Sequence, residues 1–132
     1  MKTRYRNTDL DLISTVPLDG LNQKLEAAGM MVLGTHQNGD GDWTTVLGII
    51  GEEDDCFWVD VETTIVAMLN ILESLPEQER RAFEQCKLRE FNAAYDLGDA
   101  PVGFNQGLSV DTISRMAALK TSLRITLYPG DG

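Results

Sequence analysis

Residues 30–50 carry the sequence MMVLGTHQNGDGDWTTVLGII, and this stretch decides the fold. Its first part, Met30 to Thr35, predicts a strand. The Asn-Gly and Asp-Gly pairs within residues 37–42 tolerate the left-handed backbone that a tight turn needs. Trp43 to Ile50 then predicts a second strand that is apolar on both sides, which favours a central place in a sheet.

The segments on either side continue the alternation of strands and helices. Before this unit, residues 9–14 predict a short strand, and leucines at helical spacing predict a helix over residues 17–29. After it we expect a helix with its apolar stripe from Val61 to Leu72, a helix from Ser74 to about Cys86, a strand over 88–97, a loop over 98–107, a helix capped by Ser109, and a strand over 123–127.

Two details of these helices follow from the local pattern. Ser74, followed by Pro76 and Glu77, is expected to cap the second of the two middle helices. In the last helix, Ile113, Met116 and Ala117 are expected to face inward.

The order of elements predicts one α+β domain over residues 1–132. The first six elements have the order of a ferredoxin-like βαββαβ sheet, and a C-terminal helix and strand are added to it. The helices are expected mainly on one face of an antiparallel or mixed sheet. The other face is then left to be covered or to bind something.

The charge of the chain is unevenly distributed. Residues 25–79 contain twelve Asp and Glu and no Lys or Arg, whereas residues 1–24 and 80–132 each carry a formal charge of +1. The formal net charge of −10 therefore belongs to the middle of the sequence. A fold that places this segment on one side would have a negative face that attracts cationic partners.

This bias predicts a non-catalytic binding protein that docks a basic protein partner, in an immunity-type or regulatory role. The residues expected to form the acidic docking surface are Glu52, Glu53, Asp54, Asp55, Asp60 and Glu62, with Trp58 as a source of affinity if it is exposed. A homodimer could form through a strand edge or through the open face of the sheet. The charge would oppose self-association through the middle segment, so the C-terminal half is the expected interface of such a dimer.

An alternative function is a small-ligand site in the C-terminal half, where polar and aromatic residues are concentrated. Its expected lining residues are Arg89, Asn92, Tyr95, Asn105 and Tyr128, with Arg89 pairing an anionic group. The competing interpretation is that the asparagines satisfy loop backbone and the aromatic rings pack in the core.

No motif predicts catalysis, a metal or a cofactor. His36 is the single histidine and has no cysteine at ligand spacing. Asn38, Asp40 and Asp42 have the spacing of the first calcium-loop ligands, but the later Gly and Glu positions hold Trp43 and Ile49. The glycines match neither a dinucleotide fingerprint nor a Walker loop. We therefore expect no enzyme, no metal site and no cofactor.

Composition also limits the partner and the compartment. An acidic chain with a pI near 4.4 is repelled by phosphate backbones and anionic lipids, so nucleic acid and membrane are not expected partners. Cys56 and Cys86 are far apart in the sequence, which favours free thiols in a reducing cytoplasm over a disulfide.

The last third of the chain resembles a group of small uncharacterised bacterial proteins. The residues that carry the resemblance are Arg89-Glu90-Phe91-Asn92, Tyr95-Asp96, Phe104-Asn105-Gln106-Gly107-Leu108-Ser109, Thr112, Ala117-Ala118-Leu119 and Leu123-Arg124-Ile125-Thr126-Leu127-Tyr128-Pro129. The resemblance implies a bacterial intracellular protein and transfers no activity. In size and charge, though not in motif, the chain is also similar to acidic immunity proteins that neutralise toxins.

Overall fold

The computed structural model describes residues 2–49, 60–99 and 103–129. Within them the chain forms five strands and four helices. In chain order these are β1 (Arg4–Ser14), α1 (Asp19–Ala27), β2 (Met30–Gln37), β3 (Trp43–Ile49), α2 (Val61–Glu73), α3 (Glu77–Glu84), β4 (Leu88–Asp96), α4 (Val110–Ala118) and β5 (Ser122–Tyr128). The expected α+β class is confirmed.

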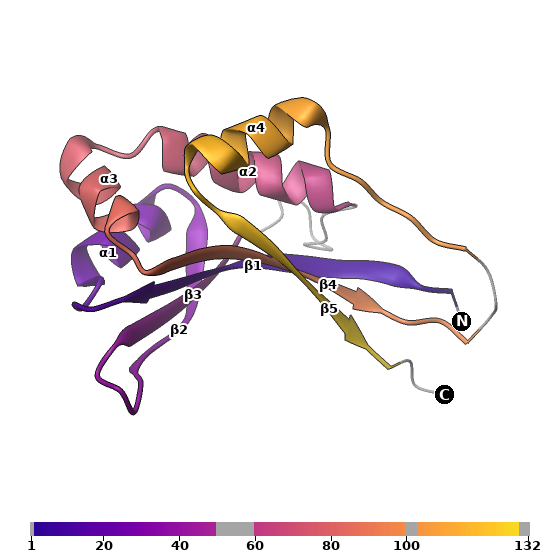
Figure 1. The fold of residues 1–132 in the computed structure, drawn as a ribbon, viewed down its shortest axis with the longest axis horizontal. Coiled ribbons are helices and arrows are strands. Elements are labelled where there is room, and N and C mark those ends of the chain that lie inside the picture. Colours follow the sequence, from indigo (N-terminus) through magenta and orange to yellow (C-terminus); the bar gives the residue numbers. More distant parts are fainter. Residues whose placement is uncertain (1, 50–59, 100–102, 130–132) are drawn as a thin grey trace.

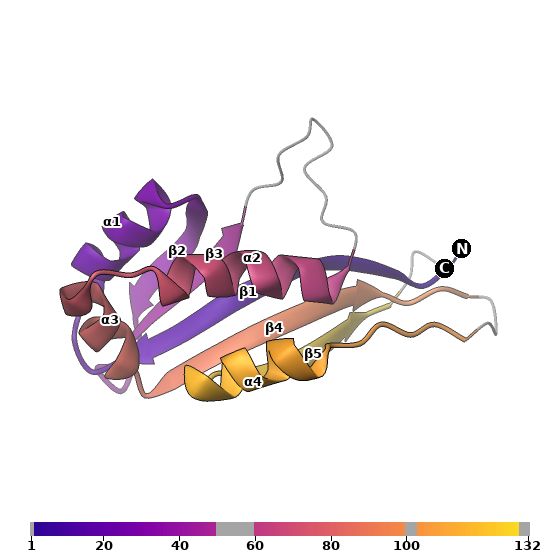
Figure 2. The same ribbon diagram turned by 90° about the horizontal axis from the view of Figure 1, so that it is seen from above.

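The five strands form one mixed sheet in the order β2-β3-β1-β4-β5. The pairs β2–β3, β3–β1 and β1–β4 are antiparallel, and β4–β5 is parallel because α4 carries the chain back across the sheet. The four described helices lie on one face of this sheet (Figure 1). No described helix covers the opposite face, which we call the open face. Figure 2, turned by 90°, shows the helices in front of the sheet.

The core lies between the sheet and the helices. Leu10 and Leu12 of β1 and Phe91 of β4 are fully buried, as are Ile65 and Met68 of α2. These residues sit at alternate positions of the strands and at helical spacing in α2, so each element turns one side to the same core. Loss of one such leucine side chain costs about 2–5 kcal/mol of folding free energy.

Side-chain caps fix where two of the helices begin. The Asp60 side chain accepts a hydrogen bond from the Thr63 backbone N–H at 2.7 Å and starts α2. The expected cap at Ser109 is confirmed, because its Oγ accepts from the Thr112 backbone N–H and starts α4. The expected cap at Ser74 is wrong. Ser74 ends α2, and α3 begins after Pro76 without a side-chain cap.

The expectation for the inward side of α4 is also corrected. Met116 is buried as expected, but its inward neighbour is Thr112, while Ile113 and Ala117 are exposed. Arg115 explains the orientation, because its guanidinium reaches Glu73 of α2 at 2.7 Å and turns that side of α4 toward α2.

Among the described residues, no helix is long and apolar enough to cross a bilayer.

Candidate functional site

The acidic residues expected to dock a partner are only partly described. Glu52, Glu53, Asp54, Asp55 and Trp58 lie outside the described residues.

Asp60 and Glu62 are described, and both hold helix ends. Asp60 caps α2, and Glu62 Oε1 accepts a hydrogen bond from the Ser109 backbone N–H at 2.7 Å, at the start of α4. That backbone hydrogen bond lowers the pKa of Glu62 below its ordinary value. These two carboxylates therefore serve the fold whether or not they also meet a partner.

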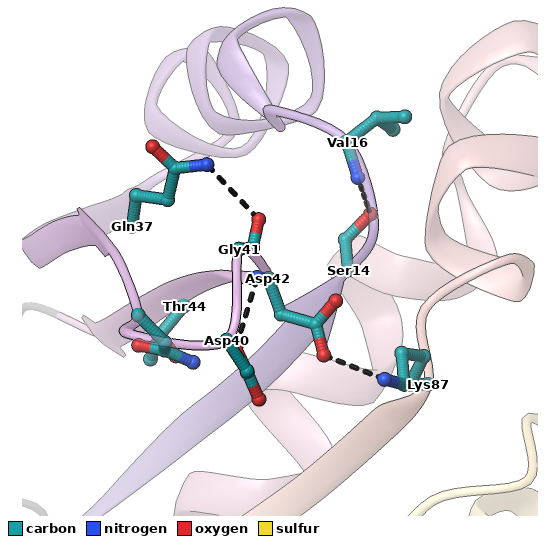
Figure 3. A network of polar contacts seen from close by, with 9 residues as sticks. Ser14, Val16, Gln37, Asp40, Gly41, Asp42, Thr44 and Lys87 are labelled. Carbon is teal, nitrogen blue, oxygen red and sulfur yellow. Dashed lines mark hydrogen bonds and ion pairs between the residues drawn. The ribbon is translucent and has the colours of Figure 1, made fainter.

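Other carboxylates of the middle segment are ion-paired with bases from residues 80–132. Asp42 accepts from Lys87 Nζ at 2.5 Å, beside the β2–β3 turn that the Asp40 side chain closes by accepting from the Asp42 backbone N–H (Figure 3). Glu73 pairs with Arg115 at 2.7 Å. Glu77 pairs with Arg81 at 2.6 Å. Acidic and basic residues are separated along the sequence, and the fold brings some of them together in ion pairs.

The structure does not bring the five residues of the expected C-terminal pocket together. Asn92 and Tyr128 lie on the open face of the sheet, Arg89 and Tyr95 lie on the helix face, and Asn105 is in an exposed loop. The Arg89 side chain is used by the backbone. It donates to the carbonyl oxygens of Phe83 and Glu84 at the end of α3, and of Lys120 after α4.

A different set of polar side chains converges on the open face. Alternation along β1 places Asp9 and Asp11 on this face, opposite Asn92 and Glu90 of β4. From β5, Arg124 Nε donates to Glu90 Oε1 at 2.7 Å, and Thr126 Oγ1 donates to Asn92 Oδ1 at 2.7 Å. We call the residues Asp9, Asp11, Glu90, Asn92, Arg124 and Thr126 the open-face cluster.

Two carboxyl groups of this cluster form no ion pair within the described part of the chain, although the charge of Arg124 acts on Asp11. Asp9 and Asp11 are half-buried on β1, and neither forms an ion pair there. Burial, and next the nearby Asp11 charge, raise the pKa of Asp9 to about 6. Burial, and next the Glu90 charge, raise the pKa of Asp11. A half-buried carboxyl group with a raised pKa is typical of a site that lacks a cationic partner.

A hollow of about 1010 Å³ lies beside Asp9. It forms where β1 extends beyond β3, because β3 pairs with β1 only from Leu10 to Ser14. Its side chains on the open face include Arg4, Arg6, Asn7, Asp9, Met31, Leu33, Asp96 and Tyr128.

Gly48 is one of the residues that line this hollow. A methyl group on Gly48 would come within 3.2 Å of the Leu33 side chain and 3.9 Å of Asp9 Oδ1, so the absence of a side chain leaves that space free. Glycine at this position therefore preserves the hollow beside Asp9.

Two arginines and one aspartate line another part of the hollow. Arg4 and Arg6 approach Asp96 at 3.2 Å and 3.6 Å, and the Arg6 guanidinium lies 4.6 Å from the centre of the Tyr128 ring. The hollow is thus lined by two carboxylates, Asp9 and Asp96, and by two guanidinium groups that both approach Asp96.

The described residues contain no group of three or more His, Cys, Asp and Glu side chains that could hold a metal ion. Burial raises the pKa of the Cys86 thiol to about 11, so this cysteine is a poor nucleophile at neutral pH.

One local pattern in the sequence predicts part of this site, although the distribution of charge along the chain does not reveal it. Asp9-Leu10-Asp11-Leu12 alternates strictly, which places both aspartates on one side of a strand and both leucines on the other. These aspartates lie in the nearly neutral N-terminal segment, and nothing local shows that Glu90 and Arg124 join them.

No family model, no curated protein and no solved structure matches this chain.

Proposed function

We propose that this chain is a non-catalytic binding protein that docks a basic protein partner on the open face of its sheet, in an immunity-type or regulatory role. The observation that carries the proposal is the pair Asp9 and Asp11. Both are half-buried on one face, neither forms an ion pair within the described residues, and the pKa of Asp11 stays raised although the Arg124 charge lowers it. A lysine or arginine from a partner would supply the missing charge.

Asp9 and Asp11 are already partly desolvated in the folded protein, before any partner binds. Folding has removed Asp9 and Asp11 from part of their water, and their raised pKa values express that cost. A cation placed beside them is attracted more strongly than beside a fully hydrated carboxylate, because less water screens the charges. The net charge of −10 would also raise the association rate of a basic partner.

The acidic run Glu52–Asp55, with Trp58, remains a prediction as a second part of the docking surface. It would add to the negative field around the molecule. The cytoplasm remains the predicted compartment, and the one cysteine described, Cys86, is free and buried.

The ferredoxin-like assignment of the first four strands is also proposed. The antiparallel order β2-β3-β1-β4 supports it, because β1 and β2 run in the same direction with β3 between them, as in a split βαβ unit. The strand β5 and helix α4 are then the addition to that core.

A titration with a lysine-rich peptide of about ten residues tests the docking site without knowledge of the natural partner. We expect the backbone signals of Asp9 and Asp11 to shift in NMR spectra at about 20 mM salt, and binding to weaken about tenfold at about 300 mM salt. The double variant Asp9→Asn/Asp11→Asn should lose the shifts on the open face and most of the affinity.

The matched control removes the same charge elsewhere. Glu26→Gln/Glu79→Gln changes an exposed carboxylate of α1 and a half-buried one of α3, and should leave the open-face shifts unchanged. If both double variants lower the affinity equally, the peptide senses net charge alone and the open-face site is refuted.

A second candidate function rests on the hollow beside Asp9. Its two arginines, Arg4 and Arg6, suit a small anionic ligand better than the separated residues of the expected C-terminal pocket do. A thermal-shift screen of small carboxylates and phosphates should then find a stabilising compound whose effect is lost in Arg6→Ala and kept in Arg81→Ala. A screen without such a compound would eliminate this candidate.

A further inference from the structure

The exposed apolar side chains of this protein are concentrated in one region. Of the eleven large apolar residues exposed in the described part of the chain, eight lie between residues 97 and 128. Three of them, Leu123, Ile125 and Leu127, occupy alternate positions of β5 and are 42%, 52% and 56% exposed. A cluster of this kind is typical of an interaction surface.

These three side chains point to the helix side of the sheet, yet none of the described helices buries them. The parallel register pairs them with Phe91, Ala93 and Tyr95 of β4, which belong to the core.

Helix α4 leaves them uncovered because it leans toward α2. Arg115 lies on the side of α4 that contacts α2, so Ile113 and Ala117 lie on the opposite side, above the β5 edge. We call Ile113, Ala117, Leu123, Ile125 and Leu127 the β5–α4 surface.

The backbone of β5 is also open. It is the last strand of the sheet in the described residues, so the N–H and C=O groups along its outer edge have no strand partner there. An edge strand with exposed apolar side chains is a template for another strand. The side chains and the backbone therefore indicate the same kind of contact, an added strand.

We propose that the strand added to β5 belongs to a second copy of this chain, paired antiparallel about Ile125. The sequence Ser122-Leu123-Arg124-Ile125-Thr126-Leu127-Tyr128 alternates polar and apolar residues symmetrically about its centre. A two-fold axis at Ile125 sets Leu123 of each copy opposite Leu127 of the other. Such self-complementarity is what an isologous dimer contact requires.

Charge also fits a second copy at this place. Within residues 103–129 the charged residues are Asp111, Arg115, Lys120 and Arg124, and the two arginines are neutralised by Glu73 and Glu90. The acids responsible for the net charge of −10 lie elsewhere.

The symmetry also brings opposite charges together. The two-fold axis sets the two α4 helices antiparallel on the same face, so the Asp111 end of one lies toward the Lys120 end of the other. Arg124 meets the uncharged Thr126 and not its own symmetry mate.

This contact lies on the helix side and outer edge of β5, so the inference goes beyond the proposed open-face function. Light scattering coupled to size exclusion should give a mass near 29.2 kDa, twice the 14.6 kDa of the chain. Ile125→Lys should reduce it to about 14.6 kDa, because two lysines would meet at the axis. Val16→Lys, at a residue that is 54% exposed before α1, is the matched control and should stay dimeric.

Cross-linking tests the register even if a lysine at position 125 prevents folding. In a Cys56→Ser background, Ile125→Cys should form an intermolecular disulfide on mild oxidation, since directly opposed residues lie within disulfide range. Leu123→Cys alone should not, because the two copies of that residue would be about 13 Å apart along the strands. A mixture of Leu123→Cys and Leu127→Cys chains should cross-link.

A monomeric wild-type chain would overturn the proposal, as would a dimer that survives Ile125→Lys and forms no disulfide through Ile125→Cys. A monomer whose β5 instead binds a different protein would also refute it, because the strand would then have another occupant. None of these results bears on the peptide titration of the open face, so the two proposals fail separately.

Discussion

Strands β1 and β5 have the same alternation of polar and apolar residues but opposite environments. Leu10 and Leu12 of β1 are 0% exposed, whereas Ile125 of β5 is 52% exposed. β1 has a strand on each side and α2 above it, while β5 is at the edge of the sheet and α4 leans away from it. Alternation thus shows which side chains share a face, and the position in the sheet decides whether that face is buried.

The polar sides of the two strands differ in the reverse way. On β5, Arg124 and Thr126 each reach a partner on β4. On β1, Asp9 and Asp11 are crowded by neighbouring strands and form no described ion pair, although Asn7 donates to Asp9 and the Arg124 charge lowers the pKa of Asp11. The central strand thus has a buried apolar side and carboxyl groups without a described ion pair, whereas the edge strand has an exposed apolar side and paired polar groups. We therefore propose that the polar side of β1 binds a basic partner and that β5 pairs with a second copy of the chain.

Replacement of the apolar residues by alanine should show the largest difference between the two strands. We expect Leu10→Ala to lower the free energy of unfolding by about 3 kcal/mol, because it leaves a cavity in the core. Ile125→Ala should lower it by less than about 1 kcal/mol in the dilute monomer. Urea unfolding at low protein concentration measures both. Equal losses would mean that β5 is buried in the monomer and would break the comparison.

Neutralising Asp9 should have a smaller and pH-dependent effect. Because the pKa of folded Asp9 is raised to about 6 from an ordinary 3.8, the folded state keeps a proton that the unfolded state releases in that interval. Stability should therefore fall as the pH rises through this window. Asp9→Asn should be more stable than the wild type at pH 7.5, by on the order of 1 kcal/mol after allowance for solvent screening, and the difference should vanish near pH 4.

Urea unfolding at the two pH values tests this, with Asp40→Asn as a control at the exposed turn. A stabilisation of Asp40→Asn equal to that of Asp9→Asn would assign the effect to net charge. A constant difference between Asp9→Asn and the wild type at both pH values would assign it to packing and not to titration.

The smallest expected effect links the two strands directly. Arg124 of β5 lowers the pKa of Asp11 on β1, so Arg124→Ala should raise that pKa further. Arg81→Ala, which removes an exposed base from α3, should leave it unchanged. A carboxyl-detected NMR titration measures the shift. An unchanged Asp11 titration in Arg124→Ala would show that the open-face cluster does not act as a unit.

Local patterns predicted most of the elements. The strand–turn–strand unit of residues 30–50, the stripe of α2 and the Ser109 cap depend on neighbours in sequence, and each was found within the described residues. β1 begins at Arg4, well before the expected start at Asp9. Its polar first residues carry no alternation signal and form a strand because β4 pairs with them.

The candidate site was far less predictable. The expected acidic surface followed from net charge along the sequence, but Asp42, Glu73 and Glu77 are paired with bases from the C-terminal segment. The open-face cluster joins side chains that are more than a hundred residues apart, as Asp9 and Arg124 are. Only the strand order brings them together, and no local pattern contains that order.

The most direct test of the account is the titration of the Asp9 carboxyl group by NMR, alone and with the lysine-rich peptide. We predict a midpoint near pH 6 for the free protein and a lower midpoint when the peptide is bound, because a cation favours the charged form. A free midpoint near 3.8, or one that the peptide leaves unchanged, would contradict the claim that Asp9 lacks a cationic partner.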